Sequence, residues 1–280
     1  MIFARDKSQM CNNLLQFAHV YAYAREHGRS VLSMRFSYKY PFFAIRHTRY
    51  VSFFLYLVAK AAAFLRILPT ASYRDGCDKD ALDRMVAGHR HIVVAGWNVR
   101  HYDLFLKYRN EICRLFRIDE AYTLPVRAKM RVLDEERGLR LGLHIRRGDY
   151  AQWADGRYFY DDATYAAYVM AFARLHPGVQ VHVYIATNDP GVTEPDFSRT
   201  LLEGSEAGEE VPKVHLLGGT PPEDLYMLSQ CDALIGPPST FSLVAAMYRD
   251  IPLCRMDRAG AETLTEEDFR KFDYWFRRIE

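Results

Sequence analysis

The sequence predicts an α/β protein in which two doubly wound, parallel sheets form two Rossmann-like halves with a cleft between them. Short apolar runs of strand length alternate with segments of helical periodicity, and no repeat or low-complexity tract interrupts them. A polar break near Lys129–Gly138 separates the halves. We therefore expect an N-terminal domain over residues 1–136, a C-terminal domain over 137–262 and an amphipathic C-terminal helix within 263–280.

The N-terminal half starts with an expected helix, because apolar residues recur at helical spacing in Cys11–His27. The apolar segments Ser30–Met34 and His91–Ala95 are expected strands. Tyr102–Phe116 has helical periodicity, whereas Pro125–Glu136 is expected to be a polar connecting segment.

In the C-terminal half, strands and helices alternate regularly. Leu139–Ile145 and Val181–Ala186 are apolar strands, and the helix Asp162–Leu175 lies between them. The Asp161-Asp162 pair is expected to cap that helix, and Pro177-Gly178 to end it. The further expected elements are the strands Val214–Leu217 and Ala233–Gly236 and the helices Pro222–Cys231, Thr240–Tyr248 and Thr265–Ile279.

The composition argues against several classes of protein. The 280 residues include 37 Lys and Arg and 35 Asp and Glu, and the net charge of +2 gives no field that attracts nucleic acid. Five scattered cysteines without C-x-x-C spacing argue against a disulfide framework or zinc knuckle and fit a reducing compartment. No G-x-S-x-G elbow of a serine hydrolase occurs. No secretory signal is evident, so we expect a cytoplasmic protein.

The apolar segment Val51–Leu68 approaches the lower length limit for a membrane span, but Lys60 and Arg66 within it make spanning costly. We favour a buried helix of the N-terminal half. The alternative is a helix on an anionic membrane surface, since aromatic and basic residues surround the segment. In that case the protein binds peripherally at the inner face of the membrane, where a lipid-linked acceptor would bring it.

The run His144-Ile145-Arg146-Arg147-Gly148-Asp149-Tyr150 stands directly behind the apolar residues of a predicted strand. That strand delivers two arginines to the carboxyl edge of a sheet, where ligands bind in open α/β folds. A guanidinium group offers a planar, bidentate donor set that fits phosphate oxygens. An Arg–Asp ion-pair cluster at the surface is the alternative to a site for a phosphorylated ligand.

Two other strand ends favour the ligand site. Thr187-Asn188-Asp189 follows one strand, and Gly236–Ser242 follows another. Gly236–Ser242 places small hydroxyl residues at the start of a helix. Such residues alone indicate only an N-cap, but next to the two arginines they indicate a phosphate-binding site. Asp189 and Asp224 would repel phosphate and are expected to bind donor groups of a base or ribose. Guanine is favoured, because its N1–H and N2–H₂ groups pair well with one carboxylate.

The run His144–Tyr150 resembles the H-x-R-R-x-D-Y signature of α-1,2-fucosyltransferases, a family distantly related to α-1,6- and protein O-fucosyltransferases. Further segments in residues 7–250 resemble that family in the same order: Met10–Ala18, Gly96-Trp97 with Tyr102 and Phe105, Tyr184–Asp189, and Leu228–Gly236 followed by Ser239–Ser242. The resemblance implies a GT-B glycosyltransferase fold whose C-terminal domain binds a GDP-sugar while the N-terminal domain faces the acceptor. It also implies inverting transfer of L-fucose from GDP-β-L-fucose to a glycan hydroxyl, with the 2-hydroxyl of a galactoside expected.

The resemblance further implies roles for single residues. Arg146 would contact the diphosphate and is the expected catalytic residue. The other expected nucleotide-sugar-binding residues are His144 and Asp224 at the guanine, Asp189 at the ribose or holding the site, Ser239, Thr240 and Phe241 at the phosphates and nucleoside, and Asn12 at the sugar or phosphate. Arg147 and Asp149 are expected to brace the loop through an ion pair.

One part of the resemblance is incomplete. In the first motif, Ser8, Gln9 and Cys11 replace the usual glycines. Side chains there restrict the approach of backbone to a ligand, so acceptor preference or donor geometry is expected to differ from the typical family member. Two alternatives stay open: a transferase for another GDP-sugar, such as GDP-mannose, and a non-catalytic GDP-sugar-binding protein.

No metal or other cofactor is expected, because an arginine and helix N–H groups can stabilise the charge that grows on GDP. Asp78-Lys79-Asp80 has D-x-D spacing, but it follows a polar stretch and is interpreted as a solvated loop. The general base is not identified; Asp103, Asp149 and Asp155 are candidates by position.

The acceptor stays open among a surface-polysaccharide glycan, a lipid-linked oligosaccharide and a protein. An aromatic-rich loop follows the arginine motif and contains Tyr150, Trp153, Tyr158, Phe159 and Tyr160. Its rings are suited to stack on acceptor sugars and equally suited to pack in a core or lid.

Overall fold

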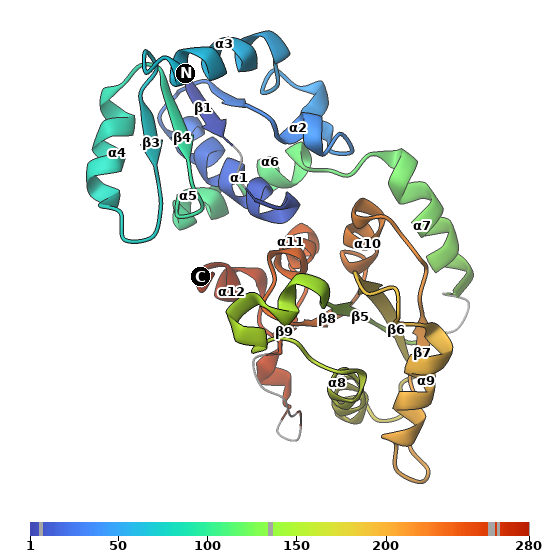
Figure 1. Ribbon diagram of the computed structural model, residues 1–280. Coiled ribbons are helices and arrows are strands. Elements are labelled where there is room, and N and C mark those ends of the chain that lie inside the picture. The colour runs from blue at the N-terminus through green and yellow to red at the C-terminus, as the bar shows by residue number, and fades with distance from the viewer. Residues whose placement is uncertain (6–7, 134–136, 257–260, 262–263, 280) are drawn as a thin grey trace. The chain divides into compact units, whose positions relative to one another are not determined.

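The computed structural model describes all residues except 6–7, 134–136, 257–260, 262–263 and 280 (Figure 1). The described chain divides into two units, Met1–Asp119 and Glu120–Glu280, and each contains one parallel sheet with helices. The expected α/β class with two parallel sheets is confirmed. The division falls before helix α7 (Glu120–Leu133), not after residue 136, because α7 packs on α10 (Pro221–Leu228) of the second unit.

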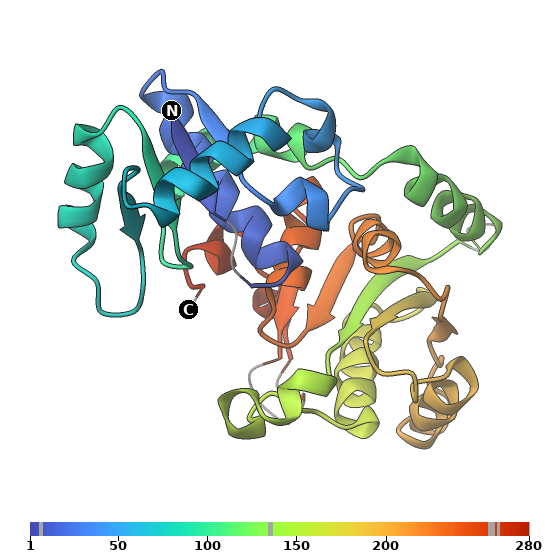
Figure 2. The ribbon, with the colours of Figure 1, turned by 45° about the horizontal axis from the view of Figure 1, so that its top comes forward.

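In the first unit, four parallel strands lie in the order β2-β1-β4-β3. They are β1 (Ile2–Arg5), β2 (Val31–Ser33), β3 (Thr70–Ser72) and β4 (Ile92–Ala95). The helices are α1 (Met10–Glu26), α2 (Phe36–Lys39), the 3₁₀ helix η1 (Ala44–His47), α3 (Phe53–Phe64), α4 (Lys79–Gly88), α5 (Tyr102–Lys107) and α6 (Arg109–Leu115). Helix α3 lies on one face of this sheet and α1 on the other (Figure 1 and Figure 2).

The first unit confirms most predicted elements. The predicted helix Cys11–His27 is α1, and the predicted strands Ser30–Met34 and His91–Ala95 are β2 and β4. Tyr102–Phe116 is helical but divides into α5 and α6 at Tyr108, whose φ of −101° and ψ of 11° interrupt the helix.

The sequence reading missed β1, β3 and α4. The two strands have only four and three residues, too few to show an alternating pattern. Asp78-Lys79-Asp80 is exposed to solvent as expected, but the expected loop is wrong, because α4 starts at Lys79. Asp78 is the N-cap of α4, and its Oδ1 accepts a hydrogen bond from the Ala81 N–H at 2.9 Å.

The expectation of a buried helix in Val51–Leu68 is also wrong. Of the residues of α3 only Ala59 is fully buried, whereas Phe54 and Phe64 are 73% and 85% exposed. A narrow inner stripe contacts core residues of β1, β2 and β4, and no described element covers the opposite face. Within the described residues, no helix combines the length and apolar character that crossing a membrane requires.

The second unit has five parallel strands in the order β7-β6-β5-β8-β9. They are β5 (Leu139–Ile145), β6 (Val181–Thr187), β7 (Lys213–His215), β8 (Ala233–Gly236) and β9 (Leu253–Arg255). Besides α7 and α10, its helices are α8 (Asp162–Leu175), α9 (Glu194–Glu203), α11 (Thr240–Arg249), α12 (Phe272–Phe276) and the 3₁₀ helices η2 (Gly148–Ala151), η3 (Trp153–Gly156) and η4 (Glu266–Asp268).

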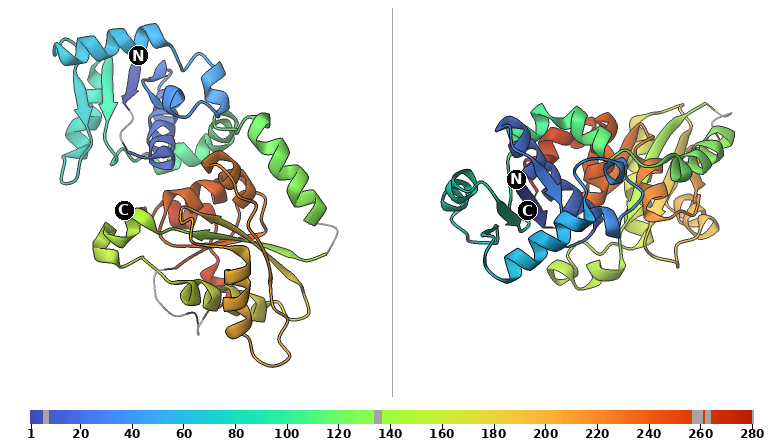
Figure 3. Two further views of the ribbon diagram at one scale, coloured as in Figure 1. Left: turned by 45° about the vertical axis from the view of Figure 1, so that its right-hand side comes forward. Right: turned by 90° about the horizontal axis from the view of Figure 1, so that it is seen from above.

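The strand order of the second sheet defines a topological switch point. Helices α8 and α9 cover one face of the sheet, and α10 and α11 cover the other (Figure 1 and Figure 3). The chain therefore leaves the central strands β5 and β8 toward opposite faces. The carboxyl ends of such a pair flank the crevice where ligands bind in open α/β sheets.

The predicted strands β5 to β8 and helices α8, α10 and α11 are confirmed, whereas α9 and β9 were missed. The expected connecting segment Pro125–Glu136 is wrong, because its described residues belong mostly to α7. Val126 and Met130 are buried and stand one helical turn apart, so α7 has an apolar stripe despite its polar composition.

The expected C-terminal helix Thr265–Ile279 is shorter than predicted. Backbone hydrogen bonds join Arg270 to Leu253 in both directions, at 2.9 and 3.1 Å, and this bridge interrupts the helix. The short α12 follows and buries Phe272 and Phe276.

Candidate functional site

Arg146 and the N-terminus of α11 lie at the switch point of the second sheet. Arg146 directly follows β5, and α11 begins shortly after the neighbouring strand β8. A Cβ atom on Gly236 would lie 2.9 Å from Ser242 Oγ and 3.1 Å from His144 Cβ. The missing side chain at Gly236 therefore lets α11 pack directly against the end of β5.

His144 is a buried, neutral residue of this junction. Its Nδ1 lies 2.7 Å from Ser242 Oγ, and its ring centroid lies 5.1 Å from that of Phe241. Burial, together with the charge of Arg146, lowers the pKa of His144 to about 3. The imidazole can therefore donate one hydrogen bond and accept another without adding charge to the site.

Arg146 presents its guanidinium at the edge of the sheet. Asp149 accepts two hydrogen bonds from it, at 3.1 Å from Nε to Oδ1 and 2.9 Å from Nη2 to Oδ2. The backbone N–H of Arg146 donates to the Tyr165 hydroxyl at 3.2 Å. The guanidinium carbon lies 5.4 Å from the centroid of the Tyr150 ring, whose hydroxyl donates to the Pro238 carbonyl. These contacts connect Arg146 to the loop that precedes α11.

Arg147 holds the loop but not with the expected partner. Its Nη1 donates to Asp189 at 3.0 Å, its Nη2 to Asp162 at 2.5 Å, and its Nε to the Tyr160 carbonyl at 3.1 Å. The expected Arg147–Asp149 pair is wrong, because Asp149 lies on the side of Arg146 instead. The network ties the end of β5 to the start of α8 and the end of β6.

Asp189 belongs to this same network. Besides the Arg147 contact, its Oδ1 accepts from the Gly191 N–H at 2.9 Å. The Gly191 hydrogen bond, followed by the Arg147 contact, holds the pKa of Asp189 below its ordinary value. Asp189 is therefore ionised and engaged within the protein.

Ser239, Thr240 and Phe241 form the start of α11. Ser239 is the N-cap, and its Oγ accepts from the Phe241 N–H at 3.2 Å. The first turn of a ten-residue helix carries a partial positive charge on its backbone N–H groups. Beside Arg146, these groups make a cationic edge, defined here as Arg146 with the first turn of α11, that can bind phosphate oxygens.

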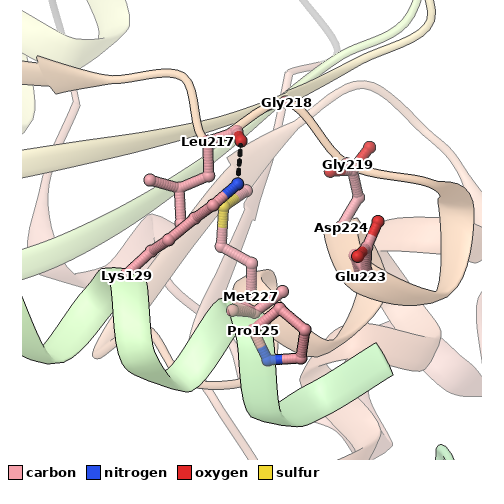
Figure 4. A pocket seen from close by; sticks show the side chains of 9 residues that line it. Pro125, Lys129, Leu217, Gly218, Gly219, Glu223, Asp224 and Met227 are labelled. Carbon is pink, nitrogen blue, oxygen red and sulfur yellow. Dashed lines mark hydrogen bonds between the residues drawn. The ribbon is translucent and has the colours of Figure 1, made fainter. Parts of the chain in front are cut away.

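Asp224 lines a separate pocket (Figure 4). The pocket is lined by Pro125, Val126 and Lys129 of α7, Leu217, Gly218 and Gly219 of the following loop, and Glu223, Asp224 and Met227 of α10. Its volume of about 10 Å³ holds a single water molecule. Burial, followed by the neighbouring Glu223, raises the pKa of Asp224 to about 7. None of the residues of the cationic edge lines this pocket. The predicted site residues of the second unit therefore form two groups, one at the cationic edge and one at the Asp224 pocket.

Asn12 is the predicted residue of the first unit. Its Nδ2 donates to Ser8 Oγ at 3.0 Å. Ser8 has a φ of 107°, a backbone conformation that favours glycine. The position where the family motif has a glycine therefore keeps glycine-like backbone geometry with a serine.

Sequence reasoning missed several residues that support the site. Tyr165 and Asp162 lie in the first turn of α8, and their helical spacing gave no sign of contacts with the arginines. Ser242 stands in the S-T-F-S block, so its presence beside His144 could have been anticipated. Lys129, which donates to the Leu217 carbonyl at 2.9 Å, lies in the segment that the sequence predicts to be a polar connection. The described residues include no cluster of three or more His, Cys, Asp or Glu side chains suited to a metal ion.

No protein-family model matches this chain, and no curated protein sequence matches it. Solved structures do. A FUT1 variant from Arabidopsis thaliana in complex with GDP is similar at a TM-score of 0.65 and 13% identity, over 96% of this chain and 73% of that one. NodZ α-1,6-fucosyltransferase co-crystallised with GDP has a TM-score of 0.53 at 14% identity, over 91% and 94% of the two chains. POFUT1 in complex with GDP has a TM-score of 0.51 at 12% identity, over 89% and 94%.

The similarity defines the fold class. Two parallel-sheet α/β regions, matched along most of their length by these proteins, are an α/β GT-B glycosyltransferase fold. The fold that the sequence resemblance implied is confirmed.

Proposed function

We propose that this protein is an inverting glycosyltransferase that moves L-fucose from GDP-β-L-fucose to a glycan hydroxyl without a metal ion. The observation that carries the proposal is the cationic edge at the β5–β8 switch point. It occurs in a fold shared with proteins solved with GDP or GDP-fucose. The H-x-R-R-x-D-Y resemblance supports the same donor.

The proposed mechanism follows from the movement of charge. As the bond from fucose C1 to the β-phosphate oxygen breaks, the sugar gains oxocarbenium character and negative charge grows on GDP. Arg146 and the N–H groups of α11 stabilise that charge more in the transition state than in the ground state. The acceptor oxygen attacks from the opposite face, loses its proton to a base and gives an α-linked product.

We assign guanine recognition to Asp224. Its carboxylate can accept from N1–H and N2–H₂ of guanine when it is ionised. Because the Asp224 pocket holds only one water, the base would lie across its opening. Asp189 is assigned to bracing the site, since Arg147 and Gly191 already use its oxygens.

The acceptor is proposed to be a galactoside that receives fucose on its 2-hydroxyl. Support comes from the α-1,2-fucosyltransferase resemblance and from a cluster of aromatic rings beside Arg146. In that cluster Trp153, 48% exposed, has its ring centroid 4.8 Å from that of Tyr150 and 5.3 Å from that of Tyr158. Exposed indole rings are suited to stack on the apolar faces of sugar rings.

A transfer assay in EDTA tests the proposal. The chain is incubated with GDP-fucose, GDP-mannose or UDP-glucose and a panel of galactosides and other glycosides, with GDP or UDP release and product linkage measured. We expect an α-linked fucosyl galactoside from GDP-fucose alone, and no product with the Arg146→Ala variant. Product from GDP-mannose alone would establish the other transferase. Tight GDP-fucose binding without turnover on any acceptor would support the non-catalytic alternative.

A further inference from the structure

Helix α3 presents an apolar surface to solvent. We define the α3 face as Phe53, Phe54, Leu57, Val58, Ala61, Phe64, Leu65 and Ile67, all exposed. Within the helix these residues recur at spacings of one, three and four, so they share one side of it. A contiguous set of large apolar side chains on a protein surface marks an interaction site.

The α3 face belongs to a well-formed helix whose other side is packed. Ser52 caps the helix, and its Oγ accepts from the Leu55 N–H. The inner side contacts the core of the first unit through Leu55, Tyr56, Ala59 and Ala63. Figure 3 shows α3 along the outside of its unit. The exposure is therefore a property of the folded unit.

Aromatic side chains extend this surface. Tyr38 of α2 is 43% exposed, and its ring centroid lies 5.5 Å from that of Phe53 and 6.0 Å from that of Tyr56. Tyrosine combines an apolar ring with a polar hydroxyl and is enriched where a protein meets the boundary of a membrane.

The stretch of sequence that contains α3 carries charge of one sign. From His27 to Arg74 the sequence holds eight Lys and Arg and no Asp or Glu. Because the whole chain has 37 basic and 35 acidic residues, the remainder carries 29 against 35. Lys60 borders the face, Arg66 follows the helix, and Arg46 and Arg49 are exposed in the segment before it. The segment that exposes these apolar residues therefore has a net charge of +8, whereas the remainder of the chain has a net charge of −6.

We propose that the α3 face docks the protein on an anionic membrane surface, with α3 lying in the plane of the leaflet. A helix of twelve residues is about 18 Å long, too short to span a hydrocarbon core. Its phenylalanine and leucine side chains would enter the boundary between headgroups and acyl chains. The surrounding lysine and arginine side chains would pair with anionic headgroups. This inference goes beyond the proposed function and does not depend on it.

Charge distinguishes this occupant from a second copy of the chain. A two-fold dimer brings the same surface of both copies together. Pairing two α3 faces would juxtapose two sets of basic residues with no acidic residue in the segment to compensate them. An anionic leaflet supplies the opposite charge and also accepts the apolar side chains.

Vesicle co-sedimentation of the full chain tests the proposal. Vesicles of phosphatidylcholine alone are compared with vesicles that also contain phosphatidylglycerol, at low and high ionic strength. The variant Phe54→Ser/Phe64→Ser removes apolar insertion, and Lys60→Glu/Arg66→Glu reverses two charges. The matched control, Val179→Ser/Leu202→Ser, replaces two exposed apolar residues of the second unit.

We expect salt-sensitive binding to the anionic vesicles, weakened at least about tenfold by each α3 variant and unchanged in the control. The variants should keep the melting temperature of the wild type, since the altered side chains are exposed. Failure of the wild type to bind anionic vesicles would overturn the proposal, and so would undiminished binding of Phe54→Ser/Phe64→Ser. A dimer in solution that the same substitutions split would assign the α3 face to a subunit interface instead.

Discussion

Asp149 holds the guanidinium of Arg146 in a two-point contact at the edge of the second sheet. The Arg146 side chain is 18% exposed, whereas that of Asp149 is 50% exposed. An ion pair with so exposed a partner contributes little net free energy. The diphosphate of the proposed donor would therefore replace Asp149 at small cost, and without ligand Asp149 keeps the guanidinium oriented.

Arg146→Lys tests whether the planar, bidentate donor set of the guanidinium matters, because lysine keeps the charge but cannot bind two phosphate oxygens in one plane. We expect kcat for fucose transfer to fall about a hundredfold, which corresponds to about 3 kcal/mol of lost transition-state stabilisation. Steady-state kinetics with GDP-fucose measure this. Arg199→Lys on the exposed surface of α9 is the control, and an Arg146→Lys enzyme with more than half the wild-type kcat contradicts the role.

Arg147→Met is expected to destabilise the protein by about 2 to 4 kcal/mol, since it leaves the carboxylates of Asp162 and Asp189 without their half-buried partner. Urea unfolding measures the change. The control is Arg199→Met, whose exposed pair with Asp196 is expected to contribute less than about 1 kcal/mol. Equal losses in the two variants would show that Arg147 does not brace the loop.

The raised pKa of Asp224 predicts pH-dependent donor binding. Guanine pairing needs the ionised carboxylate, and a pKa of about 7 leaves most of the group protonated at pH 6. GDP-fucose is therefore expected to bind about tenfold more tightly at pH 8 than at pH 6, with a weak, pH-independent affinity in Asp224→Asn. Calorimetry with GDP-fucose is preferred to GDP, because both phosphates of the sugar nucleotide are esterified. A wild-type affinity that is flat over this range refutes the assignment.

The raised pKa of Asp224 also predicts how the free energy of unfolding depends on pH in the absence of ligand. Its folded-state pKa of about 7 exceeds the ordinary value of 3.8, so the folded state holds the proton more tightly and stability falls as pH rises from 4 to 7. Asp224→Asn is thus expected to raise the free energy of unfolding at pH 8 by up to about 4 kcal/mol and to change it little at pH 4. Urea melts at both pH values provide the comparison. Equal effects at pH 4 and pH 8 would count against a titrating Asp224.

Ser8→Gly is expected to stabilise the protein by about 1 kcal/mol, because it relieves a positive φ that serine adopts at a cost. The gain is partly offset by loss of the Asn12 hydrogen bond to Ser8 Oγ. Thermal and urea unfolding measure the balance, with Ser205→Gly as a control at ordinary φ. A less stable Ser8→Gly variant would show that the hydrogen bond outweighs the strain.

The central part of the second unit was predictable because its patterns are local. The strand Leu139–Ile145 is apolar or glycine except at Arg140 and His144, and Asp161 and Ser239 are strong caps, so β5, α8 and α11 begin where expected. The convergence of Arg146 and α11 followed from parallel topology alone. The sequence does not reveal which carboxylate pairs with which arginine, because Asp149, Asp162 and Asp189 are all within reach of the loop that follows β5.

Each wrong prediction has its own physical cause. Val51–Leu68 is apolar enough to be buried, but the hydrophobic effect is non-directional, and sequence does not reveal whether another element covers a helix. The segment around Val126 and Met130 is polar on average, yet two buried residues one turn apart suffice to pack α7 on α10. The pocket at Asp224 could not be foreseen, since α7 supplies one of its walls.

The central claim is that the cationic edge binds a guanine nucleotide sugar, and thermal stabilisation tests it most directly. Melting temperatures of the wild type and Arg146→Ala are measured in EDTA with GDP, GDP-fucose, GDP-mannose and UDP-glucose. Ligand at a hundred times its dissociation constant adds about 2.7 kcal/mol to the free energy of unfolding. We predict a rise for guanine nucleotides only, largest with GDP-fucose and lost in Arg146→Ala. No rise with any guanine nucleotide would show that the arginines at the end of β5 only brace the fold.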